Sequence, residues 1–443
     1  RGCGQSLSGR TPGRSPLQDG LRISLIDRDR PTPAPAEMRK CRISPRHPGD
    51  SHVRSVFASL RAVRADSLTP ALLVPALALC AGCAQAFDGP EVVATQKARV
   101  ELTVVTSGLE HPWGIAFLPD GRALVTERPG RLRIVDRSGK VGEPLAGVPS
   151  VDAVGQGGLL DVALDPEFAR NQRIYLSFAQ KRGAEMNGTS VARAKLGAQG
   201  LEDVTVIFRQ QPAMKGGHHF GSRLIFGRDG HLFVTLGDRN SGRDKVQLLD
   251  NHVGKVVRID RDGKAPADNP YLKQAGALPE IWSIGHRNIQ GAALDPATGE
   301  LWTNEHGPKG GDELNRTLGG RNYGWPLVTY GMEYSGKPVS DRTAAPGLES
   351  PVHYWLPSIA TSGLAIYTGT AIPAWQGNVF VGGLKSGELS RLEMRDGKVV
   401  SEERLFGEAL KKRIRTVVNG PDGALYLLTD DSAGQLIRVT AAN

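Results

Sequence analysis

The residues between positions 281 and 326 are the part of the sequence best suited to chemistry. They bring an arginine and two amides together at Arg287, Asn288 and Gln290. A Gly-Pro turn, two adjacent carboxylates and an aromatic corner follow at Gly307, Pro308, Asp312, Glu313 and residues 324–326. Fixed donors beside an oxygen-rich turn suit a site for a polyanionic cofactor and a hard cation such as calcium.

Two histidines lie in a glycine-rich loop with the sequence GGHHFGSRL, at His218 and His219. Asp238 ends the next predicted strand, nineteen residues after His219. A histidine oriented by a carboxylate is a competent general base near neutral pH. A histidine held for structural reasons alone would give the same pattern. A zinc site is disfavoured, because adjacent side chains on an extended chain point in opposite directions.

Other polar residues could bind an anion or a flat ligand. Lys385 follows an apolar strand, and Arg413 and Arg415 stand two residues apart, which places both guanidinium groups on one face of a strand. Such a pair either clamps an anion or faces water. Gln156 lies among glycines that would let a flat ligand approach closely, although an ordinary glycine-rich turn has the same composition.

One sequence pattern recurs along the chain and predicts the strands and turns that must position these residues. A short turn rich in Asp, Pro and Gly leads into alternating strand residues, the signal of a hairpin. The six instances are residues 118–126, 164–177, 226–235, 294–303, 375–381 and 420–429. Six such units predict an all-β fold, a six-bladed β-propeller, whose radial closure protects sheet edges. A β-sandwich would leave the regular return of the unit unexplained.

The net charge of +9 does not indicate a nucleic-acid partner. Residues 1–86 hold 13 Arg and Lys against 6 Asp and Glu, so they carry most of the excess. No basic stripe with interleaved aromatic residues follows them. All four cysteines also precede position 87, so the remainder has neither disulfides nor thiolate metal ligands. Nucleotide-binding fingerprints such as GxGxxG after a strand are absent as well.

The first 86 residues are interpreted as a leader. Arg61 and Arg64 precede an apolar run at residues 68–81, and Ala84 and Ala86 offer small residues at the −3 and −1 positions of a cleavage site. The run is too short for a membrane span, so we expect export to the periplasm or medium. A lipid anchor at Cys83 is the minor alternative.

Three segments follow from these observations. Residues 1–86 form the leader, and because Met38 is the first methionine, residues 1–37 are interpreted as upstream translation. Residues 87–97 are predicted to be a short linker, and residues 98–443 the propeller.

Taken together, the motifs resemble the glucose/sorbosone dehydrogenase family, and most closely its soluble PQQ-dependent aldose sugar dehydrogenases. The resemblance runs from HPWGIAF at residue 111 to LTD ending at residue 430. The elements RNxQG, ExGP and NYGWP are specific in combination. The family is a six-bladed propeller that carries cofactor and calcium on one face.

The resemblance implies a role for each candidate residue. His219 would be the base that removes the proton of the anomeric hydroxyl, Asp238 its orienting carboxylate, and Arg287 the group that stabilises charge on the quinone. The residues implied to hold the cofactor are Gln156, Arg287, Asn288, Gln290, Ser358, Lys385, Arg413 and Arg415. The carbonyls of Gly307 and Pro308 would bind the calcium beside PQQ. A second calcium would use Glu313 and Tyr323, with help from Asp312.

This sequence departs from the glucose-specific branch of the family at two positions. His218 stands where that branch has a carboxylate, and Ser358 stands where it has a threonine. The loops that support dimerisation there are shortened here, which favours a monomer.

The expected function is oxidation of aldose sugars at C1 to lactones, with PQQ and calcium as cofactors and an unidentified electron acceptor. Three alternatives stay open: a sorbosone or aldehyde dehydrogenase of the same family, a calcium-dependent propeller lactonase, and a non-catalytic sugar-binding propeller. The lactonase alternative is disfavoured, because such an enzyme would not use the cationic side chains of Lys385, Arg413 and Arg415.

Overall fold

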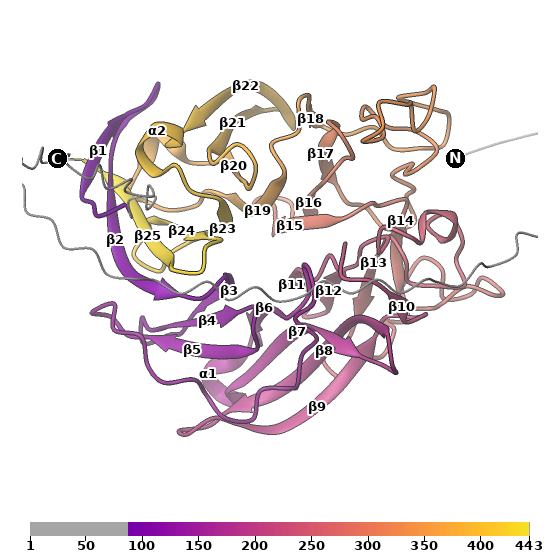
Figure 1. Cartoon of the computed structure of the whole chain (residues 1–443), viewed down its shortest axis with the longest axis horizontal. Helices are drawn as coiled ribbons and strands as arrows, with labels where there is room; N and C mark the ends of the chain where they lie inside the picture. Colours follow the sequence, from indigo (N-terminus) through magenta and orange to yellow (C-terminus); the bar gives the residue numbers. More distant parts are fainter. Residues whose placement is uncertain (1–86, 443) are drawn as a thin grey trace, which may run out of the picture. The chain divides into compact units, whose positions relative to one another are not determined.

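The computed structural model describes residues 87–442, which form a six-bladed β-propeller (Figure 1). The expectations for the leader, the apolar run and Cys83 lie outside the described residues. Among residues 87–442, no helix has the length and apolar character needed to cross a membrane.

Each blade is an antiparallel sheet, and the first three blades run in chain order. The first contains β3 (Pro112–Phe117), β4 (Ala123–Glu127) and β5 (Arg131–Val135). The second contains β6 (Leu159–Leu164), β7 (Arg173–Lys181) and β8 (Met186–Leu196), with β9 (Leu201–Arg209) and β10 (Met214–Lys215) both paired to β8. The third contains β11 (Leu224–Phe226), β12 (Leu232–Thr235), β13 (Lys255–Ile259) and β14 (Ile281–Ile284).

The next two blades have four strands each, and the last is closed by both ends of the described chain. The fourth contains β15 (Ile289–Leu294), β16 (Leu301–Glu305), β17 (Asp312–Arg316) and β18 (His353–Trp355). The fifth contains β19 (Thr361–Ile366), β20 (Val379–Gly383), β21 (Leu389–Arg395) and β22 (Lys398–Leu405). The sixth contains β23 (Ile414–Asn419), β24 (Leu425–Thr429), β25 (Gly434–Ala441), β2 (Arg99–Leu109) and β1 (Glu91–Ala94).

Helical structure in the described residues is confined to single turns. These are α1 (Phe168–Asn171), α2 (Gly407–Leu410), η1 (Arg243–Lys245) and η2 (Pro373–Trp375).

The six predicted repeats are confirmed, one per blade. Every repeat falls on the turn from the innermost strand to the second strand, as in β3–β4 and β23–β24. The innermost strands β3, β6, β11, β15, β19 and β23 contact one another in ring order. The repeated turns therefore share one end of the ring, and the opposite ends of the same strands meet at the other.

Apolar layers between neighbouring blades hold the ring together. Tyr175 and Val191 of the second blade pack with Leu224 and Val257 of the third, and all four side chains are buried. Both faces of a blade are covered in this way, so β4 and β24 are buried along their whole length. Burial of such apolar area contributes roughly 25 cal/mol per Å².

The segment 87–97 differs from the predicted linker. It includes β1, whose residues Glu91–Ala94 pair with Arg99–Leu102 of β2. β2 in turn pairs with β25, so the first strands of the described chain complete the blade made by its last strands. Sequence periodicity over four residues is too short to distinguish such an edge strand from a linker.

Candidate active site

Most of the candidate residues come from two equivalent positions of the blades; the others are Gln290 in β15, Arg415 in β23, Asp312 and Glu313 in β17, and Tyr323 after β17. Gln156, His219, Arg287, Asn288, Ser358 and Arg413 lie just before an innermost strand. Asp238, Gly307, Pro308 and Lys385 lie just after a second strand. Because these two strands are antiparallel, both positions fall at the same end of the ring. The propeller thus gathers residues that are spread over more than 250 positions of sequence.

His219 and Asp238 form a buried pair. Nδ1 of His219 lies 2.6 Å from Oδ1 of Asp238, and the two residues are 7% and 1% exposed. Oδ2 of the same carboxylate accepts a hydrogen bond of 2.9 Å from Nε1 of Trp325. Nε2 of His219 has no hydrogen-bond partner among the described residues. The carboxylate therefore fixes the ring and leaves one nitrogen available.

Charge and burial keep His219 neutral. Burial lowers its pKa, and the positive charge of Arg287 acts in the same direction, against the opposing effect of Asp238. The pKa of Asp238 is also lowered: burial would raise it, but the hydrogen bond and charge of His219 outweigh that effect. A neutral imidazole beside a carboxylate can accept a proton.

Gln156 supports the histidine loop. Its side-chain oxygen accepts a hydrogen bond of 2.8 Å from the backbone N–H of His219, and its own N–H donates to Gly217 at 2.7 Å. His219 has a φ of +52°, a left-handed conformation that is uncommon for residues other than glycine.

Arg413 lies immediately before β23 and Arg415 lies within it, and their two-residue spacing directs both guanidinium groups to the same carboxylate. The guanidinium groups of both reach Oδ2 of Asp430, at 3.4 Å and 2.7 Å. Arg415 is buried, whereas Arg413 is largely exposed. The two positive charges lower the pKa of Asp430 well below its usual range, although burial opposes them. Their carboxylate partner was not predicted.

The amides of the fourth blade connect Arg415 to the histidine loop. Oε1 of Gln290 accepts a hydrogen bond of 3.0 Å from Arg415. Oδ1 of Asn288 accepts one of 3.2 Å from Gln290 and one of 3.3 Å from the N–H of Gly221. Nδ2 of Asn288 is buried and has no partner among residues 87–442.

Arg287 lies against the Gly-Pro turn. Its Nη1 donates to the carbonyl oxygens of His306 and Gly307, at 3.1 Å and 2.8 Å. Its backbone N–H donates to Oε2 of Glu305 at 2.5 Å. The predicted cation ligand Gly307 therefore already accepts a hydrogen bond from a guanidinium group, although a carbonyl oxygen has a second lone pair.

Asp312 and Ser358 support the Gly-Pro turn from inside. The carboxylate of Asp312 accepts hydrogen bonds from the N–H of Gly307 at 2.9 Å and from the hydroxyl of Ser358 at 2.8 Å. Burial raises the pKa of Asp312. These contacts make Asp312 a support of the turn, and the hydroxyl proton of Ser358 is committed to that carboxylate.

Two adjoining cavities open among these residues. One of about 540 Å³ is lined by the predicted Gln156, Gln290, Arg413 and Arg415, together with His111, Trp113, Arg128, Phe220, His306 and Asp430. A second of about 390 Å³ is lined by the predicted Gly307, Pro308, Ser358 and Lys385, together with Tyr334 and Leu356. His306 and Ala360 line both cavities. His219 lines neither, although the adjacent Phe220 lines the first.

The proposed second cation site contains two facing carboxylates. Glu313 and Glu305 are directly opposite each other across β16 and β17. Burial and the Glu305 charge raise the pKa of Glu313. The Tyr323 hydroxyl donates to the carbonyl of Arg316, so a cation contact from Tyr323 would use its main-chain carbonyl. Among the described residues, no group of three or more Asp, Glu, His or Cys side chains is placed so that these side chains alone could hold a metal ion.

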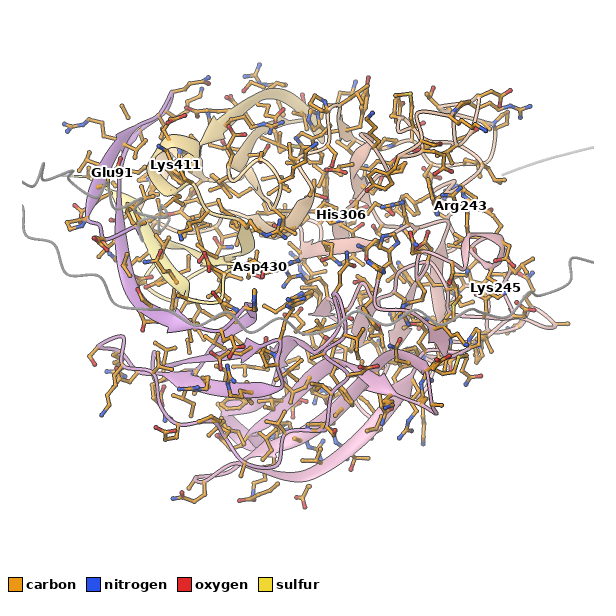
Figure 2. All side chains as sticks on the ribbon, viewed as in Figure 1. Glu91, Arg243, Lys245, His306, Lys411 and Asp430 are labelled. Carbon is orange, nitrogen blue, oxygen red and sulfur yellow. The ribbon has the colours of Figure 1, made fainter. Side chains whose placement is uncertain are left out.

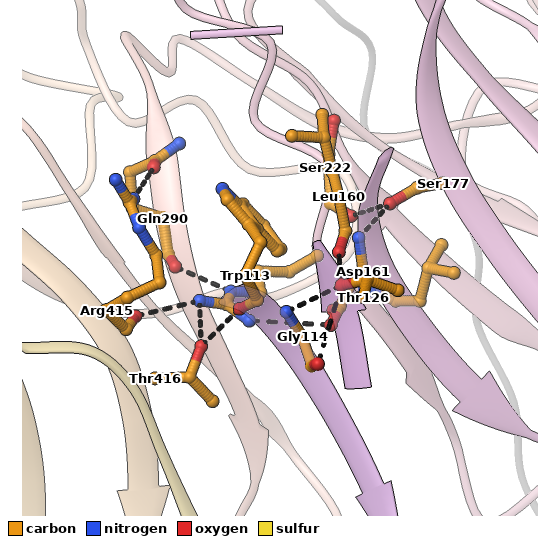
Figure 3. Close-up of polar contacts among 12 residues, drawn as sticks. Trp113, Gly114, Thr126, Leu160, Asp161, Ser177, Ser222, Gln290, Arg415 and Thr416 are labelled. Atoms are coloured by element: carbon orange, nitrogen blue, oxygen red, sulfur yellow. Dashed lines mark hydrogen bonds and ion pairs between the residues drawn. The ribbon is translucent and has the colours of Figure 1, made fainter. Parts of the chain in front are cut away.

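Buried polar contacts connect residues of several blades, among them Trp113, Gln290 and Arg415, which line the first cavity (Figure 3). Arg223 donates to the carbonyl of Gln290 at 2.7 Å and to the hydroxyl of Thr416 at 3.0 Å, and its guanidinium carbon lies 4.0 Å from the centre of the Trp113 ring. Thr416 donates to the carbonyl of Trp113 at 2.6 Å. These contacts join the first, third, fourth and sixth blades next to Arg415, whose carbonyl also accepts a hydrogen bond from Arg223.

Sequence reasoning missed several residues that line the first cavity, and four of them carry charged or imidazole side chains at equivalent places in the blades. These four are His111, Arg128, His306 and Asp430. His306 and Asp430 lie near the middle of the view in Figure 2. All four occupy the same two positions of the blade as the predicted residues, just before an innermost strand or just after a second strand. Aligning the six repeats and inspecting those positions would have found them.

Comparisons with known proteins agree with this architecture. The chain is 44% identical over 351 residues to aldose sugar dehydrogenase YliI of Escherichia coli, covering 78% of this chain and 94% of that protein. The crystal structure of the soluble E. coli enzyme in its apo form superposes with a TM-score of 0.75 over 77% of this chain and 100% of that one. A PQQ-bound aldose sugar dehydrogenase of Streptomyces coelicolor is 28% identical, with a TM-score of 0.63, covering 77% and 99% of the two chains.

Quinoprotein glucose dehydrogenase B of Acinetobacter calcoaceticus is 28% identical over 414 residues, covering 74% of this chain and 84% of that protein. The family model for glucose/sorbosone dehydrogenases matches residues 109–438, which include all six innermost strands and every candidate site residue. With that match and the E. coli relative, the chain belongs to the glucose/sorbosone dehydrogenase family.

Proposed function

We propose that this protein oxidises aldose sugars at C1 to lactones, with PQQ as electron acceptor and calcium as its partner ion. The observation that carries the proposal is the buried His219–Asp238 pair beside a cavity lined by arginines. The PQQ-bound relative of S. coelicolor and the quinoprotein of A. calcoaceticus support the choice of cofactor.

The residues of the first cavity, together with Arg287 and Asn288 beside it, fit a flat polyanion. Nε of Arg287, Nδ2 of Asn288 and Nε of Arg415 are buried donors without partners among residues 87–442. Leaving such donors unpaired costs roughly 1–3 kcal/mol each. The rings of Trp113 and Phe220 supply apolar surface in the same cavity. A planar ligand with carboxylates and carbonyl oxygens would satisfy these groups.

The residues that would hold the cofactor follow from these contacts. Arg413, Arg415 and Lys385 would bind carboxylates, and Asn288 and Gln290 would bind carbonyl or ring acceptors. The carbonyls of Gly307 and Pro308 would hold calcium at the edge of the second cavity. When bound, PQQ supplies a quinone that accepts two electrons, and calcium polarises its carbonyl.

His219 would act as the general base. Its free Nε2 takes the proton of the C1 hydroxyl, and loss of the C1 hydride together with this proton converts the sugar to its lactone. The Asp238 carboxylate stabilises the resulting imidazolium and holds Nδ1 protonated. Arg287 keeps a positive charge beside the reaction centre, which favours negative charge on the acceptor.

The surroundings of the site agree with a broad sugar preference. His218, next to the base, is exposed and offers a hydrogen-bonding group without a fixed negative charge. We further infer that the protein acts as a monomer outside the cytoplasm, on the basis of its leader and its short loops, with an electron acceptor of unknown identity.

One experiment tests the proposal. The purified protein is mixed with PQQ and calcium chloride, and reduction of an artificial dye is followed with glucose, galactose, xylose and maltose. We expect turnover that requires both cofactors and is lost in His219→Ala. Absence of turnover, together with an unchanged quinone absorbance when sugar is added, would rule the proposal out.

A further inference from the structure

Arg239, the residue after Asp238, is a buried cation without a carboxylate partner in the described chain. It is 1% exposed, and no ion pair joins it to an Asp or Glu of residues 87–442. Burial lowers its pKa to about 10. Burying a guanidinium group without a counter-charge is costly, so the contacts it makes must be important to the fold or to the site.

All four hydrogen-bond acceptors of Arg239 are neutral oxygens. Nε donates to the carbonyl of His218 at 2.9 Å, and Nη2 donates to the carbonyl of Gly216 at 2.7 Å. Nη1 and Nη2 donate to the backbone and side-chain oxygens of Asn187 at 3.2 Å and 2.6 Å. The guanidinium carbon also lies 3.9 Å from the centre of the Phe220 ring. Arg239 therefore contacts both sides of His219.

Gln156 holds the same loop through two further hydrogen bonds. Its side-chain oxygen accepts from the N–H of His219, and its backbone N–H donates to the carbonyl of Gly217. Asn187, in β8, is itself fixed by a hydrogen bond of 2.8 Å to Asp152. The loop that carries His219 thus lies between Gln156 and Arg239, and Asn187 holds Arg239 in place. A planar fork of donors can bind several carbonyls at fixed angles, which a lysine cannot do.

We propose that Arg239 is a positioning residue that holds the 216–220 loop so that His219 stays bonded to Asp238 with Nε2 directed to the substrate. Asp238 and Arg239 act on the same loop. The carboxylate fixes the ring of His219, and the guanidinium group binds two backbone carbonyls before His219 and the ring of Phe220 after it. The catalytic part of this inference rests on the proposed function, but the positioning part does not.

The test compares Arg239→Met and Arg239→Lys with a matched control, Arg391→Met, in the full-length protein. Arg391 is also 1% exposed, but it lies on β21 and pairs with Glu403 at 2.7 Å, remote from the site. We expect Arg239→Met to lower kcat by about 100-fold, the effect of a misplaced catalytic group. KM and the PQQ Kd should stay within about twofold. Arg391→Met should lower Tm and leave kcat unchanged.

A second measurement separates positioning from general loss of stability. A histidine N–H that donates to a carboxylate gives a low-field proton resonance. Two buried pairs should each give such a resonance in this protein: His219 with Asp238, and His286 with Glu305 at 2.9 Å. The first resonance is assigned by its loss in His219→Gln. We expect Arg239→Met to lose that resonance and to keep the one from His286. Arg239→Lys, which retains the charge, should weaken it.

The outcomes are distinct. Retention of the His219 resonance and of kcat in Arg239→Met would overturn the inference, and so would equal losses of kcat in Arg239→Met and Arg391→Met. If Arg239→Met does not fold, the kcat and resonance of Arg239→Lys decide in the same way. A wild-type protein without PQQ-dependent turnover would refute the proposed function, while selective loss of the His219 resonance would still support the positioning role.

Discussion

Glu305 on β16 lies directly opposite Glu313 on β17, with Asn315 donating a hydrogen bond to each carboxylate. Facing like charges destabilise a sheet unless a proton or a cation lies between them. His286 donates to Glu305 at 2.9 Å, but Glu313 has no ion pair with a basic residue of the described chain. The pair therefore suits a bound cation, which is the expectation for Glu313 that arose from the family resemblance.

Calcium should stabilise the wild-type protein through this pair. A ligand at 100 times its Kd adds about 2.7 kcal/mol to the free energy of unfolding. We expect Tm in calcium chloride to exceed Tm in EDTA by several degrees, and Glu313→Gln to remove the difference. In EDTA the variant should be at least as stable as wild type, because one of the facing charges is gone. Glu393→Gln, at an ion pair with Lys97, is the control. An unchanged calcium response in Glu313→Gln would contradict the assignment.

Replacing His219 should abolish turnover and spare cofactor binding. General-base catalysis contributes roughly 10²- to 10⁴-fold, so His219→Ala should lose that much in kcat. The PQQ Kd, measured by fluorescence titration, should change less than about twofold, since other residues would bind the carboxylates. Asp238→Asn should lower kcat as well, because it destabilises the imidazolium. Loss of PQQ binding with turnover per bound cofactor unchanged would show that His219 binds the cofactor instead.

The pH dependence of kcat should report the pKa of His219. Because burial and Arg287 lower that pKa below 6.5, the base is deprotonated at neutral pH, and kcat should fall only as the pH drops through the lowered value. Arg287→Gln removes a positive charge, so the acid limb should move to higher pH when PQQ is saturating. Arg287→Lys retains the charge and should leave the limb near its wild-type position. A shift of equal size in both variants would exclude the electrostatic explanation.

Arg415 should contribute to cofactor affinity more than any exposed cation of the site. Truncating a buried, hydrogen-bonded charge costs roughly 2 kcal/mol or more, or about 30-fold in Kd. We expect Arg415→Met to weaken PQQ binding by at least that factor and to reduce its dependence on salt. Arg413→Met should have a smaller effect, because Arg413 is largely exposed. Equal Kd values for Arg415→Met and wild type would place the cofactor elsewhere.

The arrangement of the blades could be predicted because it depends on local sequence. Turns such as residues 118–122 and 420–424 need Asp, Pro and Gly at set positions, and the strands beside them need alternating or apolar residues. These preferences operate over fewer than ten residues, so six copies are visible without any tertiary information. The β1 strand was missed because four edge residues give too weak a pattern.

The sequence by itself determined that His219 and Asp238 would belong to one blade, since His219 precedes the first strand of a single hairpin and Asp238 follows its second strand. It also determined that Arg413 and Arg415 share a face. Only the tertiary structure decided which groups meet across blades: Arg415 with Gln290, 125 residues away, and the N–H of His219 with Gln156, 63 residues away. Such contacts depend on closure of the ring, which brings strand ends together by packing and not by any local preference. The role of Arg239 could not be predicted from the sequence for the same reason. It depends on hydrogen bonds to three main-chain carbonyl oxygens, whose positions do not follow from residue types.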